Sequence, residues 1–314
     1  MASLAEMIGG AGTPGTFLGL DRAESLGAAA DIVIYGADCA TPYPWVGAYC
    51  AGGPAAIRAG SADYAGAVER VNFDLMGPLL PRGVRAVDAG DLATDAEDPA
   101  GNRDRIEAAT REILGAGAVP VLLGGDDSVP LGLLRAFDGA GPVTILQIDA
   151  HIDWRDEVRG ERLGLSSTMR RASEMAHVER IVQVGARGVG SAGMEALEAA
   201  LAWGAHLVPA HELEDGGIAR AIGLIPEGAR VVICFDVDAL DPPIMPAVIA
   251  PTAGGLTYAQ ALRLIRGVGG KATLAGVDLV EFMPERDRDG VGARTAAQLL
   301  TSILGLIGRQ RVGG

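Results

Sequence analysis

The feature that most constrains the fold is the alternation of short apolar runs with stretches rich in Ala, Leu, Glu and Arg. The apolar runs predict strands at residues 31–38, 119–125, 142–151, 180–186, 206–210, 230–238 and 273–282. The intervening stretches predict helices at 102–114, 128–138, 191–203, 257–267 and 293–308. Strands that are apolar almost throughout are buried on both faces, and alternation with helices is typical of parallel sheets. We therefore expect an α/β fold whose mostly parallel sheet is covered by helices on both sides.

No linker, internal repeat or low-complexity segment interrupts this pattern, which favours a single domain over residues 1–314. Its core is expected at about 31–308, after an N-terminal extension at 1–30. Apolar residues make up 49% of the chain and aromatic residues only 4%, so the core must consist mainly of Val, Ile, Leu and Ala.

The charge and the cysteines limit the class of partner and the compartment. A net charge of −14 argues against nucleic acid, which needs a basic surface. Acidic proteins suit metal ions and cationic ligands, although solubility is the commoner reason for such a charge. Three cysteines without a C-x-x-C motif indicate a reducing compartment. We find neither a secretory signal pattern nor an apolar run of membrane-spanning length, and expect a cytoplasmic protein without membrane partners.

Polar residues gather where the apolar runs end, and ligands of parallel sheets bind outside the carboxyl ends of the strands. Asp149 and His151 are two positions apart and share a face of their strand. Asp153 would lie about 13 Å from Asp149 on a straight strand, so we expect the chain to bend after His151. Asp236 and Asp238 also share a face, and two buried carboxylates repel each other unless a cation lies between them.

Together these five residues predict one cluster of carboxylates with an imidazole, which suits Mn²⁺ and, less specifically, other divalent ions. Two such ions can hold a hydroxide for hydrolysis. Asp241 precedes Pro242 and is expected to fix the turn. In Gly124-Gly125-Asp126-Asp127-Ser128, either carboxylate could simply cap the next helix.

Other candidates are weaker. Trp154 and Arg155 directly follow the first motif and are expected at the mouth of the site, with packing an equally good explanation. We expect ordinary loop or core roles for the remaining histidines, which are His177, His206 and His211.

These segments, in this order, resemble the ureohydrolase family, which includes arginase, agmatinase and guanidinobutyrase. DAHID at 149–153, FDVDALDP at 235–242 and GGDDS at 124–128 are similar to its D-A-H-x-D, D-x-D-x-x-D-P and G-G-D-H-S motifs, and the similarity extends over about 31–308. The resemblance implies a three-layer αβα arginase/deacetylase-like fold. It also implies a homo-trimer or homo-hexamer.

The same resemblance implies two Mn²⁺ ions per chain, with another divalent metal such as Ni²⁺ as an alternative. Asp149 and Asp236 would bridge the ions, Asp153 would serve one of them, and His151 and Asp238 would serve the other. Glu281 falls where the family holds the substrate guanidinium, and a carboxylate suits that planar cation. The implied reaction is attack of hydroxide on the guanidinium carbon, which releases urea and an amine.

The sequence departs from the family pattern at two positions. Asp127 stands where the family motif has its first histidine ligand. The ligands would then be five carboxylates and one imidazole around two dications, so the formal charge of the site falls from 0 to −1. Leu165 stands where many relatives have a histidine that binds substrate or transfers protons. A shift of the alignment by one or two residues would place Ser166 or Ser167 there. Asp153 is then one candidate for protonating the leaving amine.

We expect an agmatinase-like amidino hydrolase that acts on a small guanidino compound. The alternative is a catalytically weak or inactive subunit that supports an active paralogue in a hetero-oligomer. Asp127 and Leu165 are the residues that favour this alternative. A third possibility is hydrolysis of another amide or amidine, as the related deacetylases do. Arg155 could hold a carboxylate on the substrate tail, whereas Asp156 and Glu157 could hold an amine.

Overall fold

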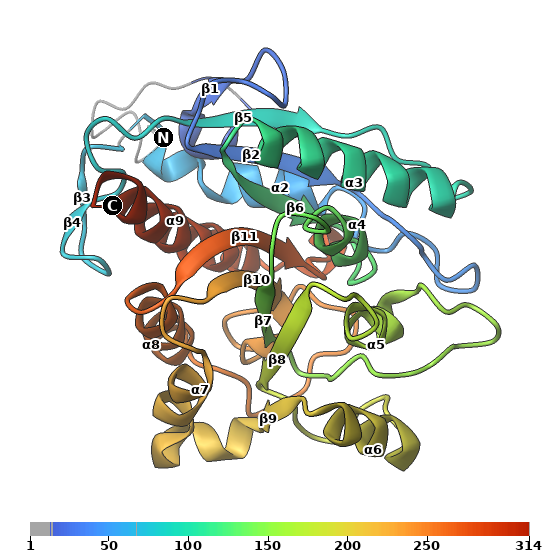
Figure 1. Ribbon diagram of the computed structural model, residues 1–314. Coiled ribbons are helices and arrows are strands. Elements are labelled where there is room, and N and C mark those ends of the chain that lie inside the picture. Colours follow the sequence, from blue (N-terminus) through green and yellow to red (C-terminus); the bar gives the residue numbers. More distant parts are fainter. Residues whose placement is uncertain (1–12, 14, 67, 314) are drawn as a thin grey trace.

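The computed structural model describes residues 13, 15–66 and 68–313 (Figure 1). In that part of the chain the centre is a nine-stranded sheet with the order β1-β5-β2-β6-β11-β10-β7-β8-β9. Each pair of neighbours runs parallel. In sheet order, the strands are β1 (Asp21–Arg22), β5 (Ala86–Asp91), β2 (Ile32–Ala37), β6 (Val119–Gly124), β11 (Thr273–Val280), β10 (Arg230–Asp236), β7 (Val143–Ile148), β8 (Val178–Val184) and β9 (His206–Val208).

Helices cover both faces of this sheet, which makes three layers (Figure 1). One face carries α2 (Gly53–Gly60), α7 (Ile218–Leu224), α8 (Tyr258–Gly269) and α9 (Val291–Val312). The other face carries α3 (Pro99–Gly115), α4 (Pro130–Arg135), α5 (Thr168–Ala172) and α6 (Met194–Trp203). The expected α/β fold with a parallel sheet between two helical layers is confirmed.

The apolar strands are explained by the two cores that they separate. In β2, Ile32 and Ile34 pack into the core beneath α2, α8 and α9, whereas Val33 and Tyr35 pack into the core beneath α3 and α4. Successive side chains of a strand point to opposite faces, so both sets must be apolar when both faces are covered. This is why the sequence shows continuous apolar runs rather than alternation.

Several elements were not predicted. These are β1, β5, α2, α5, α7 and a separate antiparallel hairpin formed by β3 (Val71–Asn72) and β4 (Gly77–Pro78). Part of the expected N-terminal extension at 1–30 packs on the domain, because β1 pairs with β5 and both Phe17 and Leu18 are fully buried. Residues 1–12 of that segment lie outside the described residues.

Helix α9 is the one described helix that is long and apolar enough to cross a membrane by length and composition. In its most apolar stretch, 72% of the residues are buried inside the protein, where they pack on α2, α8 and β11. The helix thus has the surroundings of a core helix.

Tight backbone packing at the end of β6 shapes the region where polar residues gather. Gly125 follows β6, and its N–H donates to the Ala37 carbonyl at the end of β2. A Cβ at this position would collide with the Asp38 carbonyl oxygen, so only glycine fits. The chain can therefore turn sharply after β6 and place the next two aspartates over the sheet edge.

Candidate metal centre

Four neighbouring strands deliver the candidate ligands to one edge of the sheet. Asp127 follows β6, Glu281 follows β11, Asp236 ends β10 and Asp149 follows β7. These strands are consecutive in the sheet, and none of the four side chains is more than 4% exposed. The convergence expected from the sequence is thus present in the structure.

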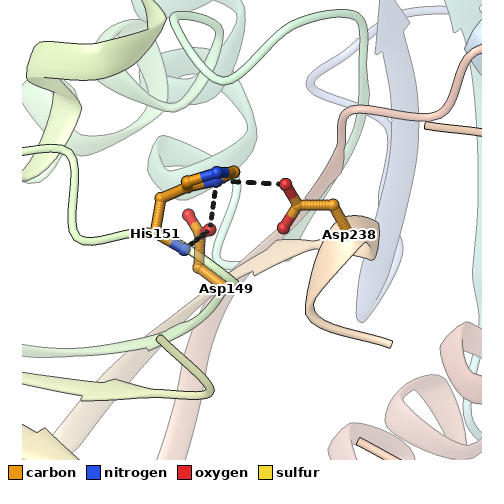
Figure 2. Close-up of side chains that lie close together, drawn as sticks. All are labelled: Asp149, His151 and Asp238. Carbon is orange, nitrogen blue, oxygen red and sulfur yellow. Dashed lines mark hydrogen bonds and ion pairs between the residues drawn. The ribbon is translucent and has the colours of Figure 1, made fainter. Parts of the chain in front are cut away.

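A first group of possible ligands consists of Asp149, His151 and Asp238 (Figure 2). The His151 Nδ1 atom lies 3.1 Å from Asp238 Oδ2 and 3.4 Å from Asp149 Oδ1. One ligand atom of each residue lies within 4.8 Å of the others, which is close enough to share one ion. The His151 side chain is 24% exposed, so this group is open to solvent on one side.

A second group consists of Asp127, Asp149 and Asp236, again with ligand atoms within 4.8 Å of one another. Asp149 belongs to both groups, so two ions bound here would share it. Among the described residues, the buried Asp127 Oδ2 atom has no hydrogen-bond partner. An unpaired buried carboxylate oxygen is costly, and a cation would satisfy it.

Asp153 completes the cluster because the chain bends where the sequence predicted it would. Its backbone has a φ of 50°, which is uncommon outside glycine. The bend brings the Asp153 and Asp149 carboxylates onto a shared donor, the Gln147 amide nitrogen, at 2.7 Å from each. All six predicted ligands therefore lie in one buried region.

The electrostatics of the cluster also fit divalent cations. Burial and the neighbouring carboxylates together raise the pKa values of Asp127, Asp153 and Asp236 well above their usual range. Burial disfavours the protonated form of His151, but its hydrogen bonds to Asp149 and Asp238 outweigh this and raise its pKa to about 12. Oxygen-rich sites of this kind with one imidazole suit Mn²⁺ and related ions, so the residues present fit the predicted metals.

Glu281 stands beside the cluster, and two residues donate hydrogen bonds to its carboxylate. Its backbone has a φ of 66°, a second strained residue at this edge. The Tyr49 hydroxyl lies 2.7 Å from both carboxylate oxygens, and the Asp127 N–H donates to Oε1 at 2.8 Å. Burial and the Asp126 charge raise the pKa of Glu281 to about 8, while the bonds from Tyr49 and Asp127 oppose that rise.

Tyr49 was not singled out in the sequence analysis. It lies in the segment after β2, 232 positions from Glu281, so local spacing gives no hint of their contact. The only signal is the concentration of aromatic residues at 43–49, an unusual feature in a chain with 4% aromatic residues.

The two candidates for the mouth of the site behave differently. Both border an open pocket with Asp156, Glu157 and Arg170. However, the Trp154 side chain is only 1% exposed and its indole N–H donates to Gln183, so the ring belongs to the core. This burial does not support substrate binding by Trp154. The Arg155 guanidinium donates to the Ser191 carbonyl.

Residues 165–168 lie against the cluster. They form a short 3-10 helix, η3 (Leu165–Ser167), and the start of α5. The Ser166 N–H donates to the Tyr43 hydroxyl at 3.4 Å, and the Thr168 hydroxyl donates to the Asp127 carbonyl. Leu165 is half-buried, whereas Ser166 and Ser167 are buried. No bond joins either serine side chain to Asp127 or Asp153 among the contacts described.

Two other aspartates have structural roles. Asp126 accepts from the Ser128 N–H at 3.0 Å, which is a local turn contact. Asp241 accepts from the N–H groups of Gly254 and Gly255 at 2.8 and 2.9 Å, which confirms that it fixes a turn. Neither residue lies in the two groups of possible metal ligands.

Comparison with known proteins places these features in context. A sequence model of the Arginase family matches residues 30–305. Human mitochondrial guanidino acid hydrolase is 34% identical over 241 residues, which are 73% of this chain and 66% of the human protein. Guanidinobutyrase from Pseudomonas aeruginosa is 34% identical over 227 residues, which are 70% of each protein. A hypothetical agmatinase from Burkholderia thailandensis, known from a crystal structure, is 28% identical with a TM-score of 0.80, and the match covers 96% of this chain and 92% of that one.

Proposed function

Because this chain belongs to the arginase family, we propose that it is a metal-dependent amidino hydrolase of small guanidino compounds. The reaction adds water to a guanidinium, R–NH–C(NH₂)₂⁺, breaks the bond from carbon to the substituted nitrogen, and yields R–NH₃⁺ and urea. The observation that carries the proposal is the buried cluster of five aspartates and one histidine, with Glu281 beside it.

The residues fit a pair of divalent ions. His151 and Asp238 would hold one ion, Asp127 and Asp153 would hold the other, and Asp149 and Asp236 would be shared. Such ions supply Lewis acidity and activate a water at neutral pH. The oxygen-rich donor set supports Mn²⁺ as the first choice, with Ni²⁺ as an alternative.

Glu281 is the group that we assign to the substrate guanidinium. Its carboxylate is buried beside the cluster and already accepts hydrogen bonds from Tyr49 and Asp127. A planar cation with paired N–H groups can replace or join these donors, and the bidentate contact would orient its central carbon. Asp153 is the candidate for the proton transfer to the leaving nitrogen, because its carboxylate lies within the cluster.

The substrate would be agmatine-like, with a tail that reaches the pocket bordered by Arg155, Asp156 and Glu157. These groups could bind a carboxylate or an amine at the end of the tail. We also propose a homo-trimer or homo-hexamer, which the exposed Phe73 and Met76 side chains support as an apolar contact surface. The free state of all three cysteines supports a reducing compartment such as the cytoplasm.

The test is a urea-release assay on the Mn²⁺-loaded protein and on its Glu281→Gln variant. Agmatine, guanidinobutyrate, guanidine, methylated guanidines and arginine would be compared at equal concentration. Loss of one charge-assisted bond, worth about 1.5–3 kcal/mol, should lower kcat/KM roughly tenfold to a hundredfold while the metal content stays the same. Unchanged kinetics in the variant would rule out this role of Glu281. Two bound metals without urea from any compound would favour the alternative, a supporting subunit of a hetero-oligomer.

A further inference from the structure

A line of buried side chains leads from the core to the metal centre. It begins at the Trp154 indole, whose Nε1–H donates to Gln183 Oε1 at 2.9 Å. The Gln183 amide nitrogen donates to Gln147 Oε1, and the Gln147 amide nitrogen donates to Asp149 Oδ2 and Asp153 Oδ2, both at 2.7 Å. Trp154, Gln183 and Gln147 are each only 1% exposed. We call these three residues the amide relay.

The chemistry of its two ends fixes the direction of the relay. An indole N–H can only donate, so the atom of Gln183 that faces Trp154 must be the amide oxygen. The Gln183 nitrogen then faces Gln147, which must in turn present its oxygen. The Gln147 nitrogen is left facing two carboxylates, which can only accept when ionised. Both ends demand the same orientation, so neither amide can flip without breaking bonds at a buried site.

The relay also uses its donors fully. The two hydrogens of the Gln147 amide serve one carboxylate each, and the second Gln183 hydrogen binds the Ile152 carbonyl at 2.8 Å. That second bond ties the relay to the chain segment between His151 and Asp153, where the backbone bends. The relay therefore touches both carboxylates and the turn that carries one of them.

The pairing of strands β7 and β8 sets the position of the amide relay. Gln147 and Gln183 are direct partners in the register of β7 and β8, so the strands themselves hold the two amides together. Gln147 and Asp149 are two residues apart along the chain, which places both side chains toward one face. A rigid sheet thus sets the place of the amide nitrogen relative to the carboxylates.

We propose that Gln147 and Gln183, aligned by Trp154, are positioning residues of the metal centre that hold Asp149 and Asp153 ready for the ions. The proposal rests on the proposed metal-dependent function. Two buried carboxylates repel each other, and the partly positive NH₂ group between them offsets that repulsion and fixes their rotamers. Partners that orient metal ligands in this way commonly change metal affinity by about 10–100-fold when they are removed.

The test measures the Mn²⁺ dissociation constant and stoichiometry of the full chain by competition with a chelating dye. Gln147→Met and Gln183→Met keep the side-chain length but remove the donors, and Trp154→Phe keeps a ring but removes the N–H that aligns the relay. We expect the apparent Kd to rise about 10–100-fold for Gln147→Met. The rise should be smaller for Gln183→Met and about threefold for Trp154→Phe, because each acts one step further away.

The matched control is Gln310→Met. Gln310 in α9 also makes three hydrogen bonds, to Leu274, Gly269 and Ala272, but on another part of the fold. Its loss should lower the melting temperature and leave the Kd for Mn²⁺ unchanged. This comparison separates a general loss of stability from a specific effect on the ions. If Gln147→Met does not fold, Gln183→Met and Trp154→Phe decide the question.

The proposal is overturned if the wild-type protein binds Mn²⁺ and the relay variants bind it within twofold of the same Kd. It is equally overturned if Gln310→Met weakens binding as much as the relay variants do. A wild-type protein that binds no divalent metal would instead remove the proposed function on which the relay depends. The two failures are therefore distinguishable in one set of titrations.

Discussion

At the scale of single residues, the structure separates aspartates that could bind metal ions from aspartates that shape the backbone. Asp236 is the last residue of β10 and Asp241 lies in the segment that follows, yet Asp236 belongs to a group of possible ligands and Asp241 binds two backbone N–H groups. Two aspartates five positions apart thus have different partners. The pair offers an internal comparison of the two roles.

We predict that Asp236→Ala reduces bound metal to less than half of the wild-type amount, whereas Asp241→Ala reduces stability but keeps the metal. The reason is that Asp236 would be shared by both ions, while Asp241 holds the turn. Elemental analysis after Mn²⁺ loading and desalting measures the first effect, and thermal unfolding measures the second. Equal metal loss in two variants of equal stability would contradict the assignment.

Tyr49 provides a second prediction, based on its contact with Glu281. Its hydroxyl favours the ionised form of Glu281, so Tyr49→Phe should raise the pKa of that carboxyl. In its proposed role Glu281 binds the substrate in the ionised form, so the acidic limb of the kcat/KM profile should move to higher pH.

The matched control for Tyr49→Phe is Tyr258→Phe, which removes a hydroxyl contact with Asp74 elsewhere in the fold. This control should leave the pH profile in place. A Tyr49→Phe profile that coincides with the wild-type profile would show that the hydroxyl does not influence the group that titrates.

At the scale of elements, the strands were predictable and several other elements were not. Buried parallel strands are apolar throughout, and this made seven of them visible as continuous runs. β5 reads Ala-Val-Asp-Ala-Gly-Asp, so it is not a continuous apolar run and was not recognised as a strand. Its Asp88 is nevertheless buried, because it pairs with Arg58. α2 reads Gly-Pro-Ala-Ala-Ile-Arg-Ala-Gly, a composition of weak helix propensity that tertiary packing overrides.

The same reasoning explains what the sequence revealed about the site. Asp149, His151, Asp153, Asp236 and Asp238 were predictable because they occupy strand ends in fixed spacing, whereas Asp127 was assigned only through the family resemblance. Gln147, Gln183 and Tyr49 were not, because their roles depend on a neighbouring strand or on a residue far along the chain. Trp154 was expected at the mouth of the site, and its burial against Gln183 could not be read from a residue type that suits both places.

The η3 helix with Leu165 supports a prediction about substrate choice. Ser166 of η3 bonds to the Tyr43 hydroxyl, and Thr168 at the start of α5 bonds to the Asp127 carbonyl, so this segment forms one side of the region around the cluster. Leu165 cannot exchange protons or bind an ammonium and a carboxylate together. We predict that arginine is turned over at least tenfold less efficiently than agmatine or guanidinobutyrate. Arginine as the best compound in the urea-release panel would disprove this.

At the scale of the whole molecule, the concentration of buried carboxylates makes stability depend on pH and metal. Burial raises the pKa of Asp278 to about 7, and burial with neighbouring charges raises those of Asp127, Asp153 and Asp236. Asp149 is shifted in the opposite direction. The raised groups outnumber it, so the native state holds more protons than the unfolded chain between about pH 4 and 7.

We therefore predict that the metal-free protein loses stability as the pH rises through that window. Each proton that only the native state holds contributes about 1.4 kcal/mol per pH unit. Denaturant unfolding in the presence of a chelator measures the slope, and Asp278→Asn should reduce it. Adding Mn²⁺ should flatten it further at pH 7. Stability that increases from pH 4 to 7 without metal would refute the prediction.

The sheet order also governs when the ligand cluster can exist during folding. Asp127 and Glu281 are 154 positions apart and meet once β6 and β11 are paired, and Asp236 and Asp149 join them only when β10 and β7 are added to the sheet. Such non-local pairing is slow because long loops must close before contacts form. We expect Mn²⁺ to leave the refolding rate nearly unchanged and to slow unfolding at least tenfold, since the ions find their ligands only after the barrier has been crossed. Stopped-flow refolding and unfolding with and without metal would measure both rates. The lifetime of the native state would then depend on how tightly the cluster binds its ions.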